Sequence, residues 1–471
     1  MQAAETELEW APPVRVVRAD RSGGGSVPGP VPKPDTPTPA DFRMLFTGDW
    51  EPIQIANLFL MDWCYRPKVQ GGWENTQKSY ADDLAQWWAF LDANGLRWDD
   101  ARAMHLKEYT KGLQMAVSPR TSRRFSTSTV QRRVGTVENL YAWAFREGYI
   151  ADRIERVLVE DTGIGIGPGK AFLPHLGTAT TKKAKRPKGR HADNDARPMQ
   201  PAVLGSILDR LGPPIFDTGM RVVPFDQDDL PRRNRLMAEA AYHTGMRAFE
   251  VTGIRLSRIE ALKPSLDPAQ PFQSFFVEVV TKGGRTRKVT VPSFMLLALL
   301  DYASNEREAA IAEAEELAVR NGVTFRRHDW LFVNGMGTNG RDLGRPTSPT
   351  TASQAFTDVV LALGHTVTVT GFQTNPETGE HVLDEDGVAV EVQIVKPAHT
   401  FHDLRHTYAV SIYSAEVRRG NREPWERLRV LLGHASADTT RNTYLRHVNV
   451  DEAALTDATM LRLRMDLDGV R

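Results

Sequence analysis

The chain has 471 residues, of which 41% are hydrophobic and 25% charged, enough for two or three domains with buried cores. Its 59 basic residues balance 59 acidic ones, so the net charge is zero and argues mildly against a nucleic-acid partner. The single cysteine, Cys64, excludes an internal disulfide framework and a multi-cysteine zinc site. Because the sequence has neither a long apolar run nor a secretory leader, we expect no membrane contact and a cytoplasmic location.

The first 44 residues are rich in glycine and proline, with SGGGSVPGPVPKPDTPTPAD at their centre. Such a segment buries too little apolar surface to offset the entropy that it would lose on ordering. We therefore expect residues 1–44 to form a disordered tail.

Helical periodicity predicts a small all-α domain over residues 45–160. One helix is expected to begin near Asn75 and to end at Asn94 and Gly95, with an apolar stripe of Tyr80, Leu84, Trp87, Trp88 and Leu91. A second helix ends near Gly148, and its stripe consists of Val130, Val134, Val137, Tyr141 and Ala144. The aromatic side chains are expected in the core rather than in a ligand site.

Basic residues form two clusters in this half of the chain. The first has Glu108 as its one acidic neighbour and consists of Lys107, Lys111, Arg120, Arg123, Arg124, Arg132 and Arg133. Of these, Arg132 and Arg133 fall outside the apolar stripe of their helix and are expected to face outward. The second cluster lies in an aperiodic segment, 161–198, expected to be an interdomain linker, and includes Lys182, Lys183, Lys185 and Arg186. Either cluster could follow a phosphate backbone, and either could equally be a solvated charged face.

Helical and strand patterns alternate from residue 199 to residue 471, the expected second domain. Residues 237–246 are typical of a buried helix, and FFVEVVTKGGRTRKVTVP predicts a β-hairpin in which Val277, Val279 and Thr281 face Lys288 and Thr290. Residues 351–354 form a capping box for a helix that ends at Gly364. Residues 366–398 predict an inserted β-hairpin, and residues 451–467 a partly amphipathic C-terminal helix.

Two segments of this domain carry cationic side chains suited to binding an anion. TGMRAFE holds Arg247 and Glu250 three residues apart, so both leave one face of a helix. Lys282 stands at the tip of the expected hairpin. Taken alone, the first is an ordinary helix ion pair and the second an ordinary surface lysine.

Two later segments add imidazoles, a second arginine and a phenol. HDLRHTYA holds His402 and Arg405 together in an apolar setting, where such groups are costly unless they serve an anion or a reaction. LGHASADTTRNTY holds His434 and, ten residues later, Tyr444. A lone histidine or tyrosine more often has only a packing role.

The combined inventory is two guanidiniums, one ammonium, two imidazoles and a phenol, which suits transfer of a phosphodiester without a metal. Arginines bind the non-bridging oxygens of the transition state in a bidentate manner. A phenol becomes a nucleophile once a base takes its proton. No carboxylate cluster of metal-binding type accompanies these groups, which disfavours a two-metal nuclease.

The ordered set R…K…H-x-x-R…H…Y closely resembles the tyrosine recombinase, or phage integrase, family. TGMRAFE resembles the first arginine box of the family, HDLRHTYA the second and LGHASADTTRNTY the nucleophile box. The resemblance runs from about residue 50 to about residue 450, and the helical part resembles the core-binding domain of the family.

The resemblance implies a phosphate-binding role for four residues. Arg247 and Arg405 would clamp the scissile phosphate, and His434 would hydrogen-bond it. Glu250 matches the acidic position that supports the first arginine.

The remaining matches concern proton transfer and attack. Tyr444 would pass its proton to His402 and attack the phosphorus to form a 3′-phosphotyrosyl link. Lys282 would protonate the departing 5′-oxygen. Because the covalent link conserves bond energy, neither ATP nor a metal or other cofactor is implied.

The family's fold is mainly α with small β-sheets and hairpins, and joins a helical core-binding domain to a catalytic domain in a C-clamp on DNA. The resemblance therefore implies double-stranded DNA with a specific core site as the partner. It also implies a homotetramer on two duplexes, assembled through the C-terminal helix, and it leaves room for accessory DNA-bending or directionality proteins.

The sequence departs from the family pattern in three places. The spacing from His434 to Tyr444 is one residue longer than the commoner one, and resembles that of some conjugative-transposon integrases. The insertion at 366–398 delays the second arginine box. Residues 1–44 do not resemble an arm-binding domain, which favours recombination at a simple core site.

Three activities remain open at this point. The first is site-specific strand exchange in integration, excision or transposition of a mobile element. A type IB topoisomerase or a hairpin-forming resolvase shares the same nucleophile. A non-catalytic DNA-binding regulator is disfavoured because every expected catalytic residue type is present.

Overall fold

The computed structural model describes residues 14–18, 42–65, 73–118, 121–150, 197–225, 231–281, 284–335, 338, 340–373, 375, 382–385, 388–434, 441 and 444. The chain divides into two compact units, the first of residues 1–192 and 370–393 and the second of residues 193–369 and 394–471. Several predictions lie outside the described residues: those for Lys282, Arg120, the linker residues Lys182, Lys183, Lys185 and Arg186, and the helix at 451–467.

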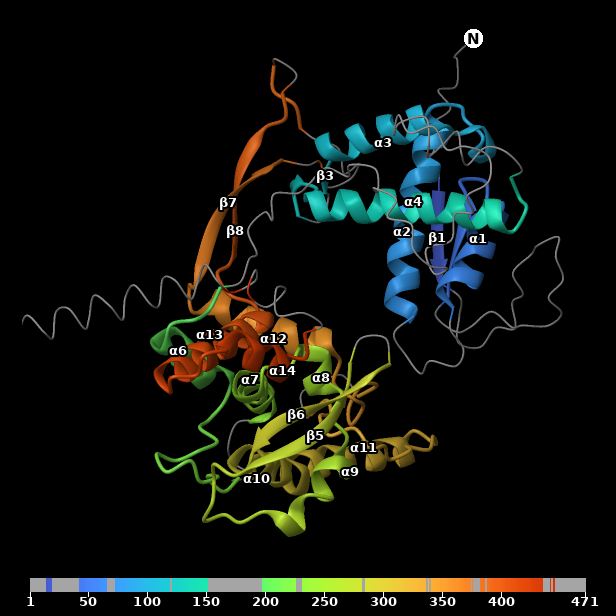
Figure 1. Ribbon diagram of the computed structural model, residues 1–471. Coiled ribbons are helices and arrows are strands. Elements are labelled where there is room, and N and C mark those ends of the chain that lie inside the picture. Colours follow the sequence, from blue (N-terminus) through green and yellow to red (C-terminus); the bar gives the residue numbers. More distant parts are fainter. Residues whose placement is uncertain are drawn as a thin grey trace, which may run out of the picture. The chain divides into compact units, whose positions relative to one another are not determined.

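Four α-helices dominate the described part of the first unit (Figure 1): α1 (Gln54–Phe59), α2 (Trp73–Ala93), α3 (Ala103–Met115) and α4 (Thr127–Arg146). Shorter elements connect them: η1 (Leu60–Cys64), η2 (Trp98–Asp100), and the two-residue strands β3 (Val117–Ser118) and β4 (Arg123–Arg124). Both predicted helices are confirmed, although α2 begins before Asn75. Their stripes meet in the core, where the Trp87 indole N–H donates to the Tyr141 hydroxyl at 3.3 Å.

A strand near the N-terminus shows that the prediction of a wholly disordered tail was wrong. β1 (Val14–Arg18) pairs antiparallel with β2 (Arg43–Thr47). The run VRVVR mixes apolar and charged residues as a strand does, but the glycine and proline content of its surroundings obscures this pattern. The Asn57 side chain anchors the pair, because it accepts from the Leu45 N–H at 2.7 Å and donates to the Leu45 carbonyl at 3.0 Å.

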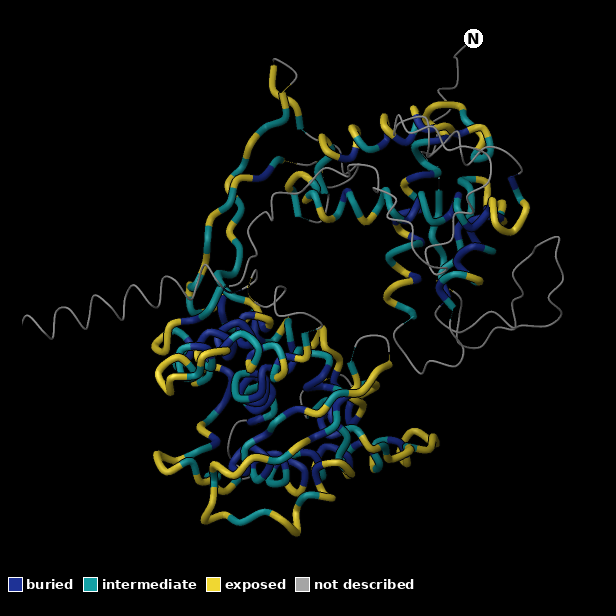
Figure 2. Tube along the Cα trace, viewed as in Figure 1, coloured by how far each residue is buried: buried dark blue, intermediate teal, exposed yellow. Residues whose placement is uncertain are grey.

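Most helices of the second unit pack around one large core, while α11 and α14 contribute to smaller apolar clusters (Figures 1 and 2). Its described α-helices are α6 (Pro201–Leu211), α7 (Arg233–Thr244), α8 (Ala248–Thr252), α9 (Leu256–Glu260), α10 (Ser293–Tyr302), α11 (Glu308–Arg320), α12 (Pro349–Ala362), α13 (Phe401–Arg418) and α14 (Pro424–Leu432). A 3-10 helix, η3 (Lys263–Ser265), and a short π-helix, η4 (Ala303–Arg307), complete the set. The core includes Met237 of α7, Phe356 of α12 and Leu404 of α13, so the predicted buried helix is confirmed.

The predicted β-hairpin is present as β5 (Ser274–Val280) and β6 (Thr286–Pro292), but its register differs from the prediction. Val277 lies opposite Val289, and Val279 lies opposite Arg287. Alternate residues of a strand share one face, so the buried face carries Val277, Val279, Val289 and Val291 together with Arg287. Lys288 lies opposite Glu278 on the other face.

The region before the second arginine box contains one helix and one two-stranded ribbon. α12 begins before the predicted capping box, because Ser348 is the N-cap and its hydroxyl accepts from the Thr351 N–H at 3.0 Å. The inserted hairpin is confirmed as β7 (Thr366–Phe372) and β8 (Glu391–Pro397). With only two-stranded sheets among the described residues, the fold is mainly α with small β-hairpins, as predicted. None of the described helices is long and apolar enough to cross a membrane.

Candidate active site

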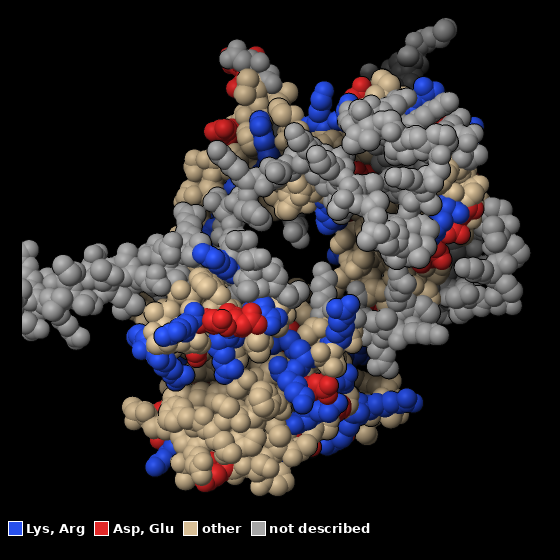
Figure 3. Space-filling view, viewed as in Figure 1, with Lys and Arg blue, Asp and Glu red and all other residues tan. Residues whose placement is uncertain are grey.

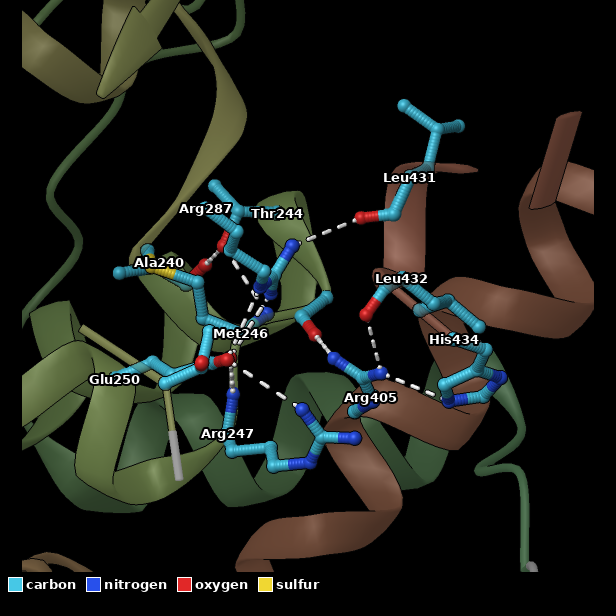
Figure 4. Close-up of polar contacts among 12 residues, drawn as sticks. Ala240, Thr244, Met246, Arg247, Glu250, Arg287, Arg405, Leu431, Leu432 and His434 are labelled. Carbon is cyan, nitrogen blue, oxygen red and sulfur yellow. Dashed lines mark hydrogen bonds and ion pairs between the residues drawn. The ribbon is translucent and has the colours of Figure 1, made fainter. Parts of the chain in front are cut away.

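The described catalytic candidates converge on the ends of three helices in the second unit. Arg247 is the N-cap of α8, Arg405 lies in the first turns of α13, and His434 follows the end of α14. Figure 4 shows these three side chains gathered around the turn that ends α7. Tyr444 packs in the apolar cluster formed by α13 and α14. The structure therefore brings both arginine boxes and the nucleophile box together.

Arg405 is almost fully buried, at 1% exposure, and donates to the last carbonyls of two helices. Its guanidinium donates to the carbonyl of Gly245 at the end of α7 and, at 2.8 Å, to the carbonyl of Leu432 at the end of α14. Such carbonyls have no partner within their own helices and attract a cation. Burial, with the charge of Arg247, lowers the pKa of Arg405 to about 10, so it stays charged at neutral pH.

His434 contacts Arg405 directly, with its Nε2 at 3.0 Å from Nη2 of the arginine. A guanidinium only donates, so Nε2 is the acceptor and the proton of the neutral imidazole sits on Nδ1. Burial and the charges of Arg405 and Arg247 lower the pKa of His434 to about 4. At neutral pH His434 is therefore uncharged and can donate one hydrogen bond from Nδ1.

Arg247 and Glu250 meet as their spacing predicts. The backbone N–H of Arg247 donates to the Glu250 carboxylate at 2.8 Å, which closes the N-terminus of α8, and the guanidinium lies 3.4 Å from the same carboxylate. Glu250 is fully buried, whereas the Arg247 side chain is 33% exposed. Of the two arginines Arg247 and Arg405, Arg247 is therefore the one whose side chain can reach a ligand in solution.

Arg287 is a contact of this site that the sequence analysis missed. Its guanidinium binds both carboxylate oxygens of Glu250, at 3.0 and 2.9 Å (Figure 4). The available signal was the alternation of residues 287, 289 and 291, which puts a cation on the apolar face of β6. The register predicted for the hairpin put Lys288 and Thr290, not Arg287, opposite the buried valines of β5.

Tyr444 is 1% exposed, and its hydroxyl lies 3.2 Å from Nδ1 of His406. The family resemblance assigns the tyrosine proton to His402, whose ring centroid lies 4.7 Å from that of His406. Burial raises the pKa of Tyr444, and the charges of Arg405 and Arg247 oppose this effect. His406 was overlooked although it directly follows Arg405 and lies one helical turn after His402.

The basic residues predicted to contact DNA from the first unit fall into two groups. The side chains of the first group are exposed, on α3 and at β4: Lys107, Lys111, Arg123 and Arg124. The second group, Arg132 and Arg133 of α4, is engaged by other side chains of the unit.

Arg133 does not face outward as predicted, because its side chain is only 12% exposed. It lies 3.7 Å from the buried carboxylate of Asp83 and 4.0 Å from the centre of the Phe125 ring. Arg132 is 45% exposed and forms an ion pair with the same carboxylate. Sequence periodicity places a residue outside the apolar stripe, but it cannot show that a buried aspartate on α2 recruits both arginines.

On the face of the second unit that Figure 3 shows, Lys and Arg side chains lie mainly across its upper part and to the right, above a largely uncharged lower part. Exposed basic residues of the described hairpin include Arg285 and Lys288. Within the described ranges, no three His, Cys, Asp or Glu side chains are grouped so as to hold a metal ion.

Two sequence models of one family match the chain. The model of the phage integrase family matches residues 221–450, and that of the phage integrase N-terminal SAM-like domain matches residues 70–148. Together the two matches cover well over half of the chain. Among curated proteins, none matches the sequence.

Several solved structures show a weak likeness to the chain. The XerH site-specific recombinase bound to a palindromic difH substrate, in a post-cleavage complex, is 14% identical over 81% of this chain and 79% of that chain, with a TM-score of 0.41. The Tn1549 transposon integrase in complex with a circular-intermediate DNA is 14% identical over 83% of this chain and 94% of that one, with a TM-score of 0.43. A lambda integrase dimer bound to a COC′ core site is 14% identical over 83% and 94%, with a TM-score of 0.42. Likenesses this weak do not assign a function.

Proposed function

We propose, from the premise that this chain belongs to the phage integrase family and is a site-specific DNA recombinase, that Tyr444 is the nucleophile which cleaves the DNA strand. The observation that carries the proposal is the position of the Tyr444 hydroxyl, 3.2 Å from an imidazole and beside the buried cation Arg405. Both neighbours favour the phenolate, one by taking the proton and the other by its charge.

The proposed step exchanges one phosphoester bond for another. The Tyr444 oxygen bonds to phosphorus while the bond from phosphorus to the 5′-oxygen breaks, leaving a 3′-phosphotyrosyl link and a 5′-hydroxyl. The family resemblance gives the tyrosine proton to His402, but the described contact favours His406 as its first acceptor. Lys282 is proposed to protonate the departing oxygen. The 5′-hydroxyl of a partner strand reverses the step, so strand exchange consumes no ATP.

Phosphate binding is proposed for the two arginines and His434. The Arg405 guanidinium donates to Gly245, Leu432 and His434 and also contacts the Tyr444 hydroxyl, so it lies where it can bind a phosphate beside the proposed nucleophile. The part-exposed Arg247 can clamp two phosphate oxygens, and Nδ1 of His434 can donate one further bond.

Covalent trapping tests the proposal. Full-length protein is mixed with nicked duplex oligonucleotides tiled across the DNA that flanks its gene, and a protein–DNA adduct that survives denaturation is expected. Tyr444→Phe should abolish the adduct and leave DNA binding intact. The matched control is Tyr408→Phe. It removes the hydroxyl of a second buried tyrosine, which lies on α13, and the adduct should still form. Adducts that persist without the Tyr444 hydroxyl would assign the nucleophile elsewhere. Relaxation of a supercoiled plasmid that lacks any specific site would favour the topoisomerase alternative.

The proposed partner is double-stranded DNA with a specific core site, contacted by residues of each unit. Lys107, Lys111, Arg123 and Arg124 are proposed phosphate contacts because their side chains are exposed. We further propose a homotetramer on two duplexes, assembled through the C-terminal helix that the sequence predicts at 451–467 and open to accessory proteins, in the cytoplasm. Sedimentation of the protein with and without a core-site duplex tests the assembly.

A further inference from the structure

Arg287 joins three segments of the second unit (Figure 4). It stands on β6, which begins four residues after Lys282 in the sequence. Its Nε and Nη2 donate to the two carboxylate oxygens of Glu250, at 3.0 and 2.9 Å, and its Nη1 donates to the Leu431 carbonyl at 3.1 Å. The side chain is 12% exposed, so these contacts are made largely out of water.

At one end of this arrangement, two guanidiniums share the Glu250 carboxylate. Arg287 binds it as a two-pronged fork, whereas the Arg247 guanidinium makes a single contact of 3.4 Å. Burial by itself raises the pKa of Glu250, but the hydrogen bonds and charge of Arg287, with the Arg247 N–H, hold it below its ordinary value. Glu250 therefore stays ionised. It places a negative charge beside Arg247 but contacts that guanidinium at only one point.

At the other end, Arg287 holds the last turn of α14. It takes the carbonyl of Leu431, and Arg405 takes the next one, that of Leu432. The chain then turns through Gly433, whose φ is +68° and where a Cβ atom would lie 2.9 Å from Cδ of Arg287. His434 follows directly. The point at which His434 leaves the helix is thus fixed by two cations and a glycine.

We propose that Arg287 is a positioning residue for DNA cleavage, one that sets the separation of Arg247 and His434 by holding Glu250 and the end of α14 at once. This inference rests on the function proposed above. Arg287 acts through Glu250 and the α14 backbone, not on the phosphate. A lysine cannot replace it, because an ammonium is a point charge and cannot serve both carboxylate oxygens and a carbonyl.

Single-turnover adduct formation on the same nicked duplexes, together with DNA affinity, measures the effect. Arg287→Lys and Arg287→Gln are expected to slow adduct formation by about 10- to 100-fold, as loss of a supporting contact commonly does, while DNA affinity is kept. The matched control is Arg327→Gln. Arg327 also joins two carboxylates, those of Glu308 and Glu315, but on the surface of the same unit, and its loss should leave the rate unchanged.

The pH profile separates positioning from simple stabilisation. Without Arg287 the burial of Glu250 dominates and raises its pKa, although Arg247 and Arg405 still face it, and His402 lies near. The carboxylate then takes up a proton at a higher pH than in the wild type, so Arg287→Gln should lose rate with falling pH more steeply than the wild type. The double variant Glu250→Gln, Arg287→Gln has no carboxyl group to titrate and should lose this extra dependence.

The outcomes distinguish this inference from the proposed function. If adducts depend on Tyr444 but form at the wild-type rate in both Arg287 variants, the role of Arg287 is overturned and the function stands. That role is also overturned, with the function intact, if Arg287→Gln merely lowers thermal stability and keeps the wild-type pH profile. If Arg287→Gln does not fold, Arg287→Lys retains the charge and carries the comparison. If no adduct depends on Tyr444, the proposed function fails and the role of Arg287 fails with it.

Discussion

Changing Arg405 or Arg247 to lysine should affect the stability of the protein to different extents, because the two side chains have different contacts. Arg405 is buried and donates to two helix-end carbonyls and to His434. Arg247 is 33% exposed, and among the described residues its guanidinium has one side-chain contact, of 3.4 Å, with Glu250. Both substitutions keep a positive charge and remove the planar fork, so both should slow DNA cleavage.

The expected effect on stability follows from the bonds that are lost. A hydrogen bond to a charged group contributes about 1.5–3 kcal/mol, and an unsatisfied buried carbonyl costs about 1–3 kcal/mol. A lysine at position 405 can keep one of the two carbonyls but not both. Arg405→Lys should therefore lower the free energy of unfolding of the second unit by about 2–4 kcal/mol. Arg247→Lys removes one long, part-exposed ion pair and should cost at most about 1 kcal/mol.

The assay must report the second unit alone, because a chain of two units need not unfold in one transition. Pulsed hydrogen exchange of α7 and α13 peptides along a urea series meets this need. Adduct formation is measured in parallel, with Arg327→Lys as an exposed-arginine control. An Arg405→Lys protein as stable as the wild type would refute the structural role of the helix-end contacts. Equal destabilisation by Arg247→Lys would refute the distinction between the two arginines.

Two further predictions concern the proton of Tyr444 and the DNA contacts of the first unit. His406→Leu, which removes the described partner of the Tyr444 hydroxyl, should slow single-turnover adduct formation by about 100-fold or more, and His406→Gln should restore part of the rate. If the His406→Leu protein forms the adduct quickly and the His402→Leu protein forms it slowly, His402 is the acceptor of the Tyr444 proton. Changing Arg123 and Arg124 to Gln should reduce the slope of log affinity against log salt by about 2, since each lost phosphate contact contributes about 0.9. Arg133→Gln should instead destabilise the helical unit and leave that slope unchanged, and a flattened slope would mean that Arg133 reaches DNA after all.

The sequence was sufficient where a signal is local. The spacing of Arg247 and Glu250 predicts their contact, and the stripes of α2 and α4 predict their buried faces. The ordered boxes predict the family. Each of these signals is contained within a few helical turns or a short motif.

The signals that failed depend on distant segments. Arg287 reaches a carboxylate 37 residues away and a carbonyl 144 residues away, and neither partner is marked in the sequence. The β1 strand finds β2 across a stretch rich in glycine and proline. Ser348 and Thr351 are both competent caps, and only the geometry of the helix start selects Ser348.

The long-range contacts of Arg287 also bear on when this protein can cut DNA. Contacts between residues far apart in sequence form late in folding, since they carry the largest loop-closure entropy. Glu250 and Leu431 are joined only when the first arginine box, β6 and the end of α14 have all docked. A nascent or partly unfolded chain therefore has the phenol of Tyr444 without an assembled clamp for the phosphate. We therefore expect strand cleavage to require the folded second unit, in which Arg247, Arg405 and His434 are brought together.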